Sequence, residues 1–298
     1  MFHESPYRLK VETAIQAVTE AAAVVLDLYE RQTANAYAKE DGSPVTDADL
    51  ASDRIIRRIL GERQPGVPIL TEEGVDQSAR LGAHRVWIAD PIDGTQQFVE
   101  RTGNFDVLLA LVEDGRPVVG VALQPTTGRL CLAVAEFGAW VGERTETLTR
   151  ISLPDQLPAV PAVGTSVWFG APMNLGAVER IAVHLGGEIA GVSQIGLTPR
   201  IVLEPRAFDL LVGFRSDGDE ISAAEWDFAV GDLFLHEAGG RLTDLAGRRL
   251  AYNKATPRVG RGFVAAIHPA LHERALEAVA RELPSPAAIP KPAGHRQT

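Results

Sequence analysis

Two carboxylates stand close together at the end of an apolar run in VWIADPIDGTQQF, residues 86–98. Asp90 and Asp93 are three positions apart, and Gly94 follows directly. Like charges at this separation repel, so one carboxyl group should hold a proton unless a positive charge compensates. Asp-Pro and Asp-Gly are also common turn dipeptides, and a surface turn is therefore the alternative.

Three further acidic sites fall at predicted ends of strands or helices. Glu72 and Glu73 follow the apolar run VPIL, Asp227 lies in the first turn of a helix predicted over 223–238, and Asp49 completes an acidic capping box with Thr46. A solvated loop, the helix dipole and the capping box explain each site separately. A hard divalent cation such as Mg²⁺, which prefers oxygen ligands, explains all of them together. Such ions can clamp a phosphate and activate a water molecule.

Competing chemistries have little support in the sequence. The motifs GxxxxGK[ST], GxSxG and HExxH are absent. His268 and His272 have a spacing of four but no third ligand nearby in the sequence, which favours a surface or capping role. Cys131 is the single cysteine and lies inside an apolar run, so we expect it in the core.

The elements that must position these side chains follow from hydrophobic periodicity. Helices are predicted over about 6–31 and from Thr46 to the Gln-Pro-Gly at 64–66, strands over 67–70 and 86–89, and an antiparallel meander over 105–142. In the C-terminal part we expect strands over 161–169, 188–196, 209–214, 241–245, 249–253 and 262–267, and helices over 174–186, 198–208, 223–238 and 269–282. The fold class is α/β (α+β), with elements both in blocks and in alternation.

We expect two halves. Residues 1–155 would form an N-terminal α+β half that carries most of the acidic sites, and residues 156–283 a C-terminal α/β half that contributes Asp227 and substrate contacts. Residues 284–298 are rich in Pro and Ala, and we expect a disordered tail there.

Composition limits the partners and the compartment. The 298 residues are 45% hydrophobic and 23% charged, as in ordinary globular proteins, and carry a net charge of −10. That charge argues against a nucleic-acid polymer, and it leaves room for a small anion held by cations or a few arginines. No apolar run is long enough to span a membrane, no secretory signal is recognisable, and one cysteine cannot form an intramolecular disulfide. We therefore expect a cytoplasmic location and no membrane partner.

Four ordered motifs resemble those of the inositol monophosphatase superfamily. DPIDGT (90–95) and EWDFAVGDLFLHEAGG (225–240) resemble its paired signature, and VTDAD (45–49) and ILTEEG (69–74) resemble its two upstream motifs. The resemblance extends from the first helix to about Leu283, and four motifs in order are far more specific than one. It implies a Mg²⁺-dependent, lithium-sensitive phosphatase with a layered αβαβα sandwich fold.

The resemblance also implies a set of metal ligands. The matching positions are the carboxylates of Glu72, Asp90, Asp93 and Asp227 and the backbone carbonyl of Ile92. Asp90 would bridge two ions, Glu72 would serve the first, and Asp93 and Asp227 the second. Two or three Mg²⁺ ions are implied, with Mn²⁺ as an alternative.

The catalytic residues implied are Asp49 and Thr95. They match the dyad that orients and deprotonates the attacking water, and the N–H groups of Gly94 and Thr95 match the phosphate-binding position. The chemistry implied is in-line attack of a metal-activated water on a phosphomonoester, without a phosphoenzyme.

Within the superfamily the sequence most resembles the 3′(2′),5′-bisphosphate nucleotidase branch, which acts on 3′-phosphoadenosine 5′-phosphate. EWD, RLAYN and the spacing around Phe98 and Phe105 follow that branch, whereas Gln96-Gln97 and the segment 196–200 depart from it. Substrate identity therefore stays open between this nucleotide and an inositol phosphate or another small sugar or alcohol phosphate. A non-catalytic binding protein is a third alternative, which the intact set of acids disfavours.

Candidate substrate contacts are Gln96, Arg200 and Arg215. The two arginines suit bidentate contacts to a second phosphate, and a surface salt bridge is the alternative for each. The resemblance leaves monomer and homodimer both open.

Overall fold

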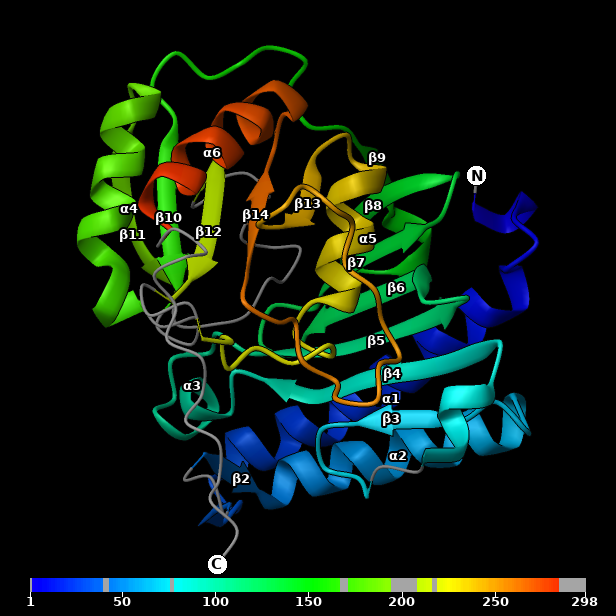
Figure 1. Cartoon of the computed structure of the whole chain (residues 1–298). Helices are drawn as coiled ribbons and strands as arrows, with labels where there is room; N and C mark the ends of the chain where they lie inside the picture. The colour runs from blue at the N-terminus through cyan, green and yellow to red at the C-terminus, as the bar shows by residue number, and fades with distance from the viewer. Residues whose placement is uncertain are drawn as a thin grey trace, which may run out of the picture.

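The computed structural model describes residues 2–39, 43–75, 78–166, 171–193, 208–215 and 219–283, with the backbone alone for 171–174 and 192–193. Helices and sheets alternate in five layers (Figure 1). Two helices cover the outer face of a seven-stranded sheet, helix α5 lies between this sheet and a five-stranded sheet, and two more helices cover the far face of the second sheet. The predicted αβαβα sandwich is confirmed. The α-helices are α1 (Arg8–Arg31), α2 (Asp47–Arg63), α3 (Thr95–Val99), α4 (Ala171–Leu185), α5 (Ala229–Glu237) and α6 (Pro269–Glu282).

The first sheet has the order β3-β4-β5-β6-β7-β8-β9, in which β3 is parallel to β4 and all later neighbours are antiparallel. Its strands are β3 (Ile69–Thr71), β4 (Arg85–Asp93), β5 (Asp106–Glu113), β6 (Arg116–Gln124), β7 (Arg129–Val134), β8 (Gly138–Gly142) and β9 (Thr149–Ile151). Asp114 and Gly115 both have positive φ, of 48° and 73°, as the tight hairpin between β5 and β6 requires. The predicted meander is confirmed.

Helices α1 and α2 cover one face of this sheet because their apolar residues recur every three or four positions. On α1 the buried positions include Val11, Ala14, Val18 and Val25, and full burial of a valine stabilises by about 1.5–3 kcal/mol. Helix α2 starts at the predicted capping box, in which Thr46 accepts from the N3 backbone and Asp49 accepts from the N-cap backbone. Before α2 a short hairpin joins β1 (Ala36–Ala38) and β2 (Pro44–Thr46), which the sequence pattern did not predict.

The second sheet has the order β11-β10-β12-β14-β13. Its strands are β10 (Ala162–Ser166), β11 (Glu188–Ser193), β12 (Leu210–Phe214), β13 (Arg241–Asp244) and β14 (Gly262–Ala266). Strand β10 is parallel to β11 and β12, while β14 is antiparallel to β12 and β13. One apolar cluster joins this sheet to α4 and α6, and another surrounds α5 between the two sheets.

The helix predicted over 223–238 is shorter, because α5 begins at Ala229. The six preceding residues form a turn in which Ala224 N–H donates to the Asp227 carboxylate at 2.7 Å. The N–H groups of Phe228 and Ala229 both donate to the Glu225 carbonyl, at 3.2 and 3.0 Å. The prediction that Asp227 lies in the first turn of the helix is therefore wrong, because Asp227 lies in the turn before α5.

The strand predicted over 249–253 is wrong, since this segment forms a loop. Tyr252 N–H donates to the Gly115 carbonyl at 3.1 Å, and Asn253 N–H donates to the Glu225 carboxylate at 2.6 Å. Asn253 also has a φ of 63°, which a strand does not accommodate. The backbone hydrogen bonds of the segment are thus made to a turn and a side chain instead of a neighbouring strand.

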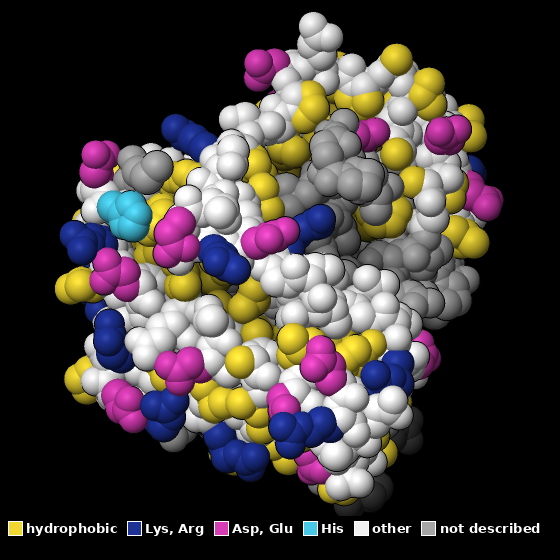
Figure 2. Space-filling model, turned by 180° about the vertical axis from the view of Figure 1, so that it is seen from behind, with side chains coloured by type: hydrophobic (Ala, Val, Ile, Leu, Met, Phe, Trp, Pro, Cys, Tyr) yellow, Lys and Arg dark blue, Asp and Glu magenta, His cyan; other side chains and the backbone are white. Residues whose placement is uncertain are grey.

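The helix predicted over 198–208 falls, except for Phe208, outside the described residues, and so do Arg200 and the predicted tail at 284–298. The division into two halves near residue 155 stays a prediction, placed between β9 and β10. No helix among the described residues is both long and apolar enough to cross a membrane. On the face drawn in Figure 2, basic and acidic side chains are interspersed, and the described residues form no extended basic surface there.

Buried His272 on α6 should make stability depend on pH. It is 2% exposed, and its Nε2 lies 2.8 Å from the Thr243 hydroxyl. Burial, with the charges of Arg241 and His236, lowers the pKa of His272 from 6.5 to about 4. As pH falls below 6.5, the unfolded chain binds the proton first, so stability is lost between pH 6.5 and 4, by roughly 3 kcal/mol.

Urea denaturation at pH 7, 6 and 5 measures this effect. We expect His272→Gln to remove that part of the pH dependence, so the difference in unfolding free energy between variant and parent changes with pH. A constant difference over this range would show that His272 does not titrate as described.

Candidate active site

A cavity of about 800 Å³ lies where the end of β4 meets the turn before α5. It is bordered by the start of α3, by the β2 hairpin and by the loop after β3. Its lining contains Lys39, Ser43, Pro44, Glu72, Asp90, Ile92, Asp93, Gly94, Thr95, Gln96, Gln97, Ser222, Ala223, Ala224, Trp226, Asp227 and Arg258. All four acidic residues predicted as metal ligands therefore border one space.

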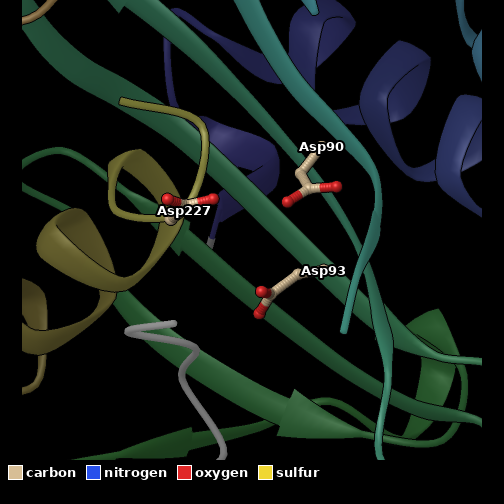
Figure 3. Close-up of side chains that lie close together, drawn as sticks. All are labelled: Asp90, Asp93 and Asp227. Atoms are coloured by element: carbon tan, nitrogen blue, oxygen red, sulfur yellow. The ribbon is translucent and has the colours of Figure 1, made fainter. Parts of the chain in front are cut away.

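Three carboxylates converge in this cavity. Asp90 and Asp93 extend from β4 and Asp227 from the turn before α5, and they face a common space (Figure 3). One oxygen of each lies within 4.8 Å of the others, and Asp90 and Asp93 are only 2% and 6% exposed. Strand β4 continues through Asp93 with a register shift between Asp90 and Asp93, so the pair lies within a bulged strand end. A bulge of this kind redirects side chains, here towards one centre.

The buried carboxylates repel one another. Burial, followed by the charges of Glu72, Asp93, Asp227 and Asp49, raises the pKa of Asp90 well above its ordinary value. Burial and the charges of Asp93 and Glu72 also raise the pKa of Asp227. The predicted repulsion is therefore present at Asp90 and at Asp227.

These residues fit a divalent metal ion. Mg²⁺ and Mn²⁺ prefer oxygen ligands such as carboxylates. The three aspartates present carboxylate oxygens close enough together to bind one ion. A doubly charged ion would also relieve the repulsion that raises the pKa of Asp90 and Asp227. Ile92 borders the same cavity, and its N–H donates to Asp90 at 3.0 Å and orients that carboxylate.

Lys39 neutralises part of the acidic wall. Its ammonium group donates to Glu72 and to Glu73, each at 2.6 Å. Burial lowers the pKa of Lys39, but the two carboxylates outweigh burial and raise it. Burial also raises the pKa of Glu73, to about 7. Glu72 borders the cavity and Glu73 is not among the described lining residues, and the role of the first glutamate as a metal ligand stays a prediction.

Asp49 and Thr95 are brought together as predicted. The Thr95 hydroxyl donates to Asp49 Oδ1 at 2.9 Å and lies 3.1 Å from the Ile92 carbonyl oxygen. Asp49 Oδ2 accepts from Thr46 N–H at 2.8 Å. Asp49 is 1% exposed, and burial raises its pKa. The arrangement places a carboxylate behind a hydroxyl that borders the cavity, which suits passage of a proton from a water molecule.

Helix α2 holds the strand end as well as the dyad. Ser52, one turn after Asp49, donates to the Pro91 carbonyl at 2.9 Å. Further along α2, Arg57 donates to the Thr71 hydroxyl at 2.7 Å, directly before Glu72. Helix α2 therefore contacts both acidic segments, the end of β4 through Ser52 and the end of β3 through Arg57.

Gly94 permits the chain reversal between β4 and α3. Its φ is 99°, and a Cβ there would lie 2.9 Å from the Asn104 carbonyl oxygen. A side chain is therefore excluded both by conformation and by space. Gly94 and Thr95 border the cavity, and their N–H groups stay the predicted phosphate-binding position.

The predicted substrate contacts differ in placement. Gln96 lines the cavity, and its side-chain amide donates to Glu100 at 2.7 Å. Arg215 lies just after β12 and is not among the described residues that line the cavity. Both stay predictions, as does Arg200.

The lining residues that were not predicted from the sequence include Lys39, Trp226 and Arg258. Trp226 stands next to Asp227 in EWD, so the motif itself was a signal for it. Lys39 and Arg258 belong to no motif, and only the fold brings them to the cavity. The guanidinium of Arg258 is anchored by donation to the Ser222 carbonyl at 2.6 Å.

Comparison with known proteins gives matches over most of the chain. The model of the inositol monophosphatase family matches residues 9–168 and 208–283. The 3′(2′),5′-bisphosphate nucleotidase CysQ of Aggregatibacter actinomycetemcomitans is 32% identical over 256 residues, covering 84% of this chain and 90% of that protein. The inositol-1-monophosphatase of Rhizobium meliloti (strain 1021) is 33% identical over 238 residues, covering 78% and 84%. The crystal structure of CysQ from Bacteroides thetaiotaomicron superposes with a TM-score of 0.69 at 26% identity, covering 86% of this chain and 96% of that one.

Proposed function

Because the chain belongs to the inositol monophosphatase family and is thus a phosphatase, we propose that it hydrolyses a 3′(2′),5′-bisphosphate nucleotide. The substrate would be 3′-phosphoadenosine 5′-phosphate and the products AMP and phosphate. A nucleotidase and an inositol monophosphatase are similar to this chain at nearly equal identity. The choice between them therefore rests on the cavity.

The observation that carries the proposal is a basic group placed in the same cavity as the acids. Two basic residues line the described part of the cavity, Lys39 and Arg258. Lys39 is already bonded to two carboxylates, whereas the guanidinium of Arg258 is held by a backbone carbonyl. Arginine has five N–H donors in a planar fork, so it can bind a second phosphate in addition. Trp226 lines the same space and supplies an aromatic surface that suits a base.

Divalent ions, when bound, supply charge neutralisation for the phosphate and a lowered pKa for the attacking water. The chain's own contribution is positioning. Asp90, Asp93 and Asp227 would hold the ions together with Glu72 and the Ile92 carbonyl. Thr95 would accept a hydrogen bond from the water and pass its proton towards Asp49, to which its hydroxyl already donates.

A substrate panel tests the proposal. Phosphate release with Mg²⁺ is measured for 3′-phosphoadenosine 5′-phosphate, inositol 1-phosphate, fructose 1,6-bisphosphate, histidinol phosphate and 2′-AMP. We expect the highest kcat/KM for the bisphosphate nucleotide. A clear preference for inositol 1-phosphate or another non-nucleotide ester would replace the proposal by the sugar or alcohol phosphate alternative.

Arg258→Gln is expected to raise KM for 3′-phosphoadenosine 5′-phosphate about 10–100-fold, since a hydrogen bond to a charged group contributes roughly 1.5–3 kcal/mol. KM for 2′-AMP, which lacks the second phosphate, should stay within about twofold of the parent, well below the tenfold that 1.4 kcal/mol represents. Arg258→Lys keeps the positive charge but lacks the planar pair of donors. Its KM for 3′-phosphoadenosine 5′-phosphate should therefore lie between those of the parent and of Arg258→Gln. Equal losses on both substrates would remove Arg258 as the second-phosphate contact.

Several family properties enter as part of the proposal. They are two or three Mg²⁺ ions per site with Mn²⁺ as a substitute, inhibition by lithium, a cytoplasmic location and a small phosphorylated metabolite as the partner. Monomer and homodimer both stay open.

A further inference from the structure

Asp227 depends on a turn that needs external support. Of the predicted ligands, Glu72, Asp90, Ile92 and Asp93 belong to β3, β4 and the loop between them, whereas Asp227 comes from the turn before α5. A metal ligand must be held within a few tenths of an ångström, and outer partners that orient ligands commonly control affinity. The position of Asp227 relative to β4 is therefore set by whatever holds residues 224–227.

Glu225 anchors this turn. Its carboxylate is 1% exposed and accepts from the backbone N–H groups of Asn253 at 2.6 Å and Lys254 at 3.1 Å. The Lys254 ammonium lies 3.4 Å from the same carboxylate, and Glu225 N–H donates to the Pro257 carbonyl at 3.0 Å. The turn that presents Asp227 is thus bound to the loop after β13.

Arg80 in turn binds that loop from the other sheet. It lies in a short 3₁₀ helix (Ser78–Gly82) directly before β4, and it is 1% exposed. Its guanidinium donates to Asn253 Oδ1 at 2.7 Å and to the Lys254 carbonyl at 2.9 Å, while the Asn253 amide donates back to the Arg80 carbonyl at 3.0 Å. Asn253 closes the RLAYN segment, so this motif has a structural use besides its resemblance to nucleotidases.

We propose that Arg80 and Asn253 are positioning residues that act through Glu225 to hold Asp227 in the metal site. These buried contacts connect Arg80, in the segment before β4, through Asn253 to Glu225, which lies two residues before Asp227 in the same turn. Without these contacts, the turn keeps its local hydrogen bonds, but its position relative to β4 is no longer fixed. The inference rests on the proposed function only in requiring that Asp227 binds a divalent cation.

Calorimetric titration with Mg²⁺ alone, on folded protein without substrate, tests the inference. Arg80→Gln should weaken Mg²⁺ binding about 10–100-fold, as loss of an outer partner of a metal ligand does. Asn253→Gly should have a similar effect, because it removes both contacts to Arg80 and tolerates the φ of 63°. This second variant keeps the test available if Arg80→Gln does not fold.

A double-mutant cycle separates positioning from general destabilisation. In an Asp227→Asn background, Arg80→Gln should change Mg²⁺ affinity by less than about twofold, since no carboxylate is left to position. Val279→Ala, a buried change on α6, serves as the control that lowers stability without altering Mg²⁺ affinity. Equal losses with and without Asp227, or unchanged affinity in both single variants, would overturn the inference.

The outcome is separable from the question of substrate. Failure of the parent protein to bind Mg²⁺ would remove the metal site and this inference together. Normal Mg²⁺ binding without hydrolysis of the bisphosphate nucleotide would reject only the proposed substrate.

Discussion

Asp90→Asn is expected to lower kcat on the order of 10²–10³-fold while raising the melting temperature of the protein in EDTA. Asp90 is 2% exposed and faces Asp93, Asp227 and Glu72, whose charges together with burial raise its pKa. The amide cannot ionise in this repulsive cluster, and it retains an oxygen to accept from Ile92 N–H. Relief of strain at a functional site commonly stabilises by about 0.5–2 kcal/mol at the expense of activity.

Thermal unfolding at pH 8 in EDTA and phosphate release in Mg²⁺ measure the two effects. Exposed Asp155→Asn is the matched control, because it makes the same chemical change outside the cavity and should alter neither quantity. Parent-like turnover by Asp90→Asn would reject the metal-bridging role. A lower melting temperature in EDTA would show that the cluster is not repulsive without metal.

Thr95→Ala is expected to lower kcat about 10²–10⁴-fold, the usual contribution of a positioned proton-transfer group. The Thr95 hydroxyl is the link between the cavity and Asp49, to which it donates at 2.9 Å. Alanine leaves the carboxylates and Gly94 in place, so Mg²⁺ affinity should be unchanged. The loss should therefore appear in kcat and not in the metal dependence.

Thr95→Ser provides the matched comparison, since it keeps the hydroxyl and removes one methyl group. We expect its kcat to stay within about tenfold of the parent, far above that of the alanine variant. Similar losses in both variants would indicate that packing of the methyl group, and not the hydroxyl, matters at this position. A solvent isotope effect on kcat that persists in Thr95→Ala would likewise argue against proton transfer through Thr95.

The parts of the fold that sequence predicted are those determined locally. The capping box at Thr46 and Asp49, the Asp114-Gly115 hairpin and the periodicity of α1 and α6 each depend on residues within a few positions. The start of α5 and the 249–253 loop were mispredicted because distant groups decide them. Glu225 accepts hydrogen bonds from residues 28 and 29 positions away, which no local pattern contains.

The same distinction applies to the site. Asp90, Asp93 and Asp227 were identifiable because each belongs to a recognisable motif at the end of an element. Lys39 and Arg258 reach the cavity from a hairpin and a loop without such motifs, so their contribution emerges only when the chain is folded. Charge alone gave no hint of them among the 29 basic residues of the chain.

The capping box of α2 has a consequence for the energetics of catalysis. Asp49 divides its two oxygens between tasks, with Oδ2 bound to the helix start at Thr46 and Oδ1 to the Thr95 hydroxyl. The rotational freedom of the carboxylate is therefore lost when the helix forms, before any substrate arrives. Preorganisation of this kind removes reorientation of the base from the activation barrier. The same side chain therefore serves both helix initiation and catalysis. Replacement of Asp49 by the longer Glu would displace either the oxygen that binds Thr46 or the oxygen that binds Thr95.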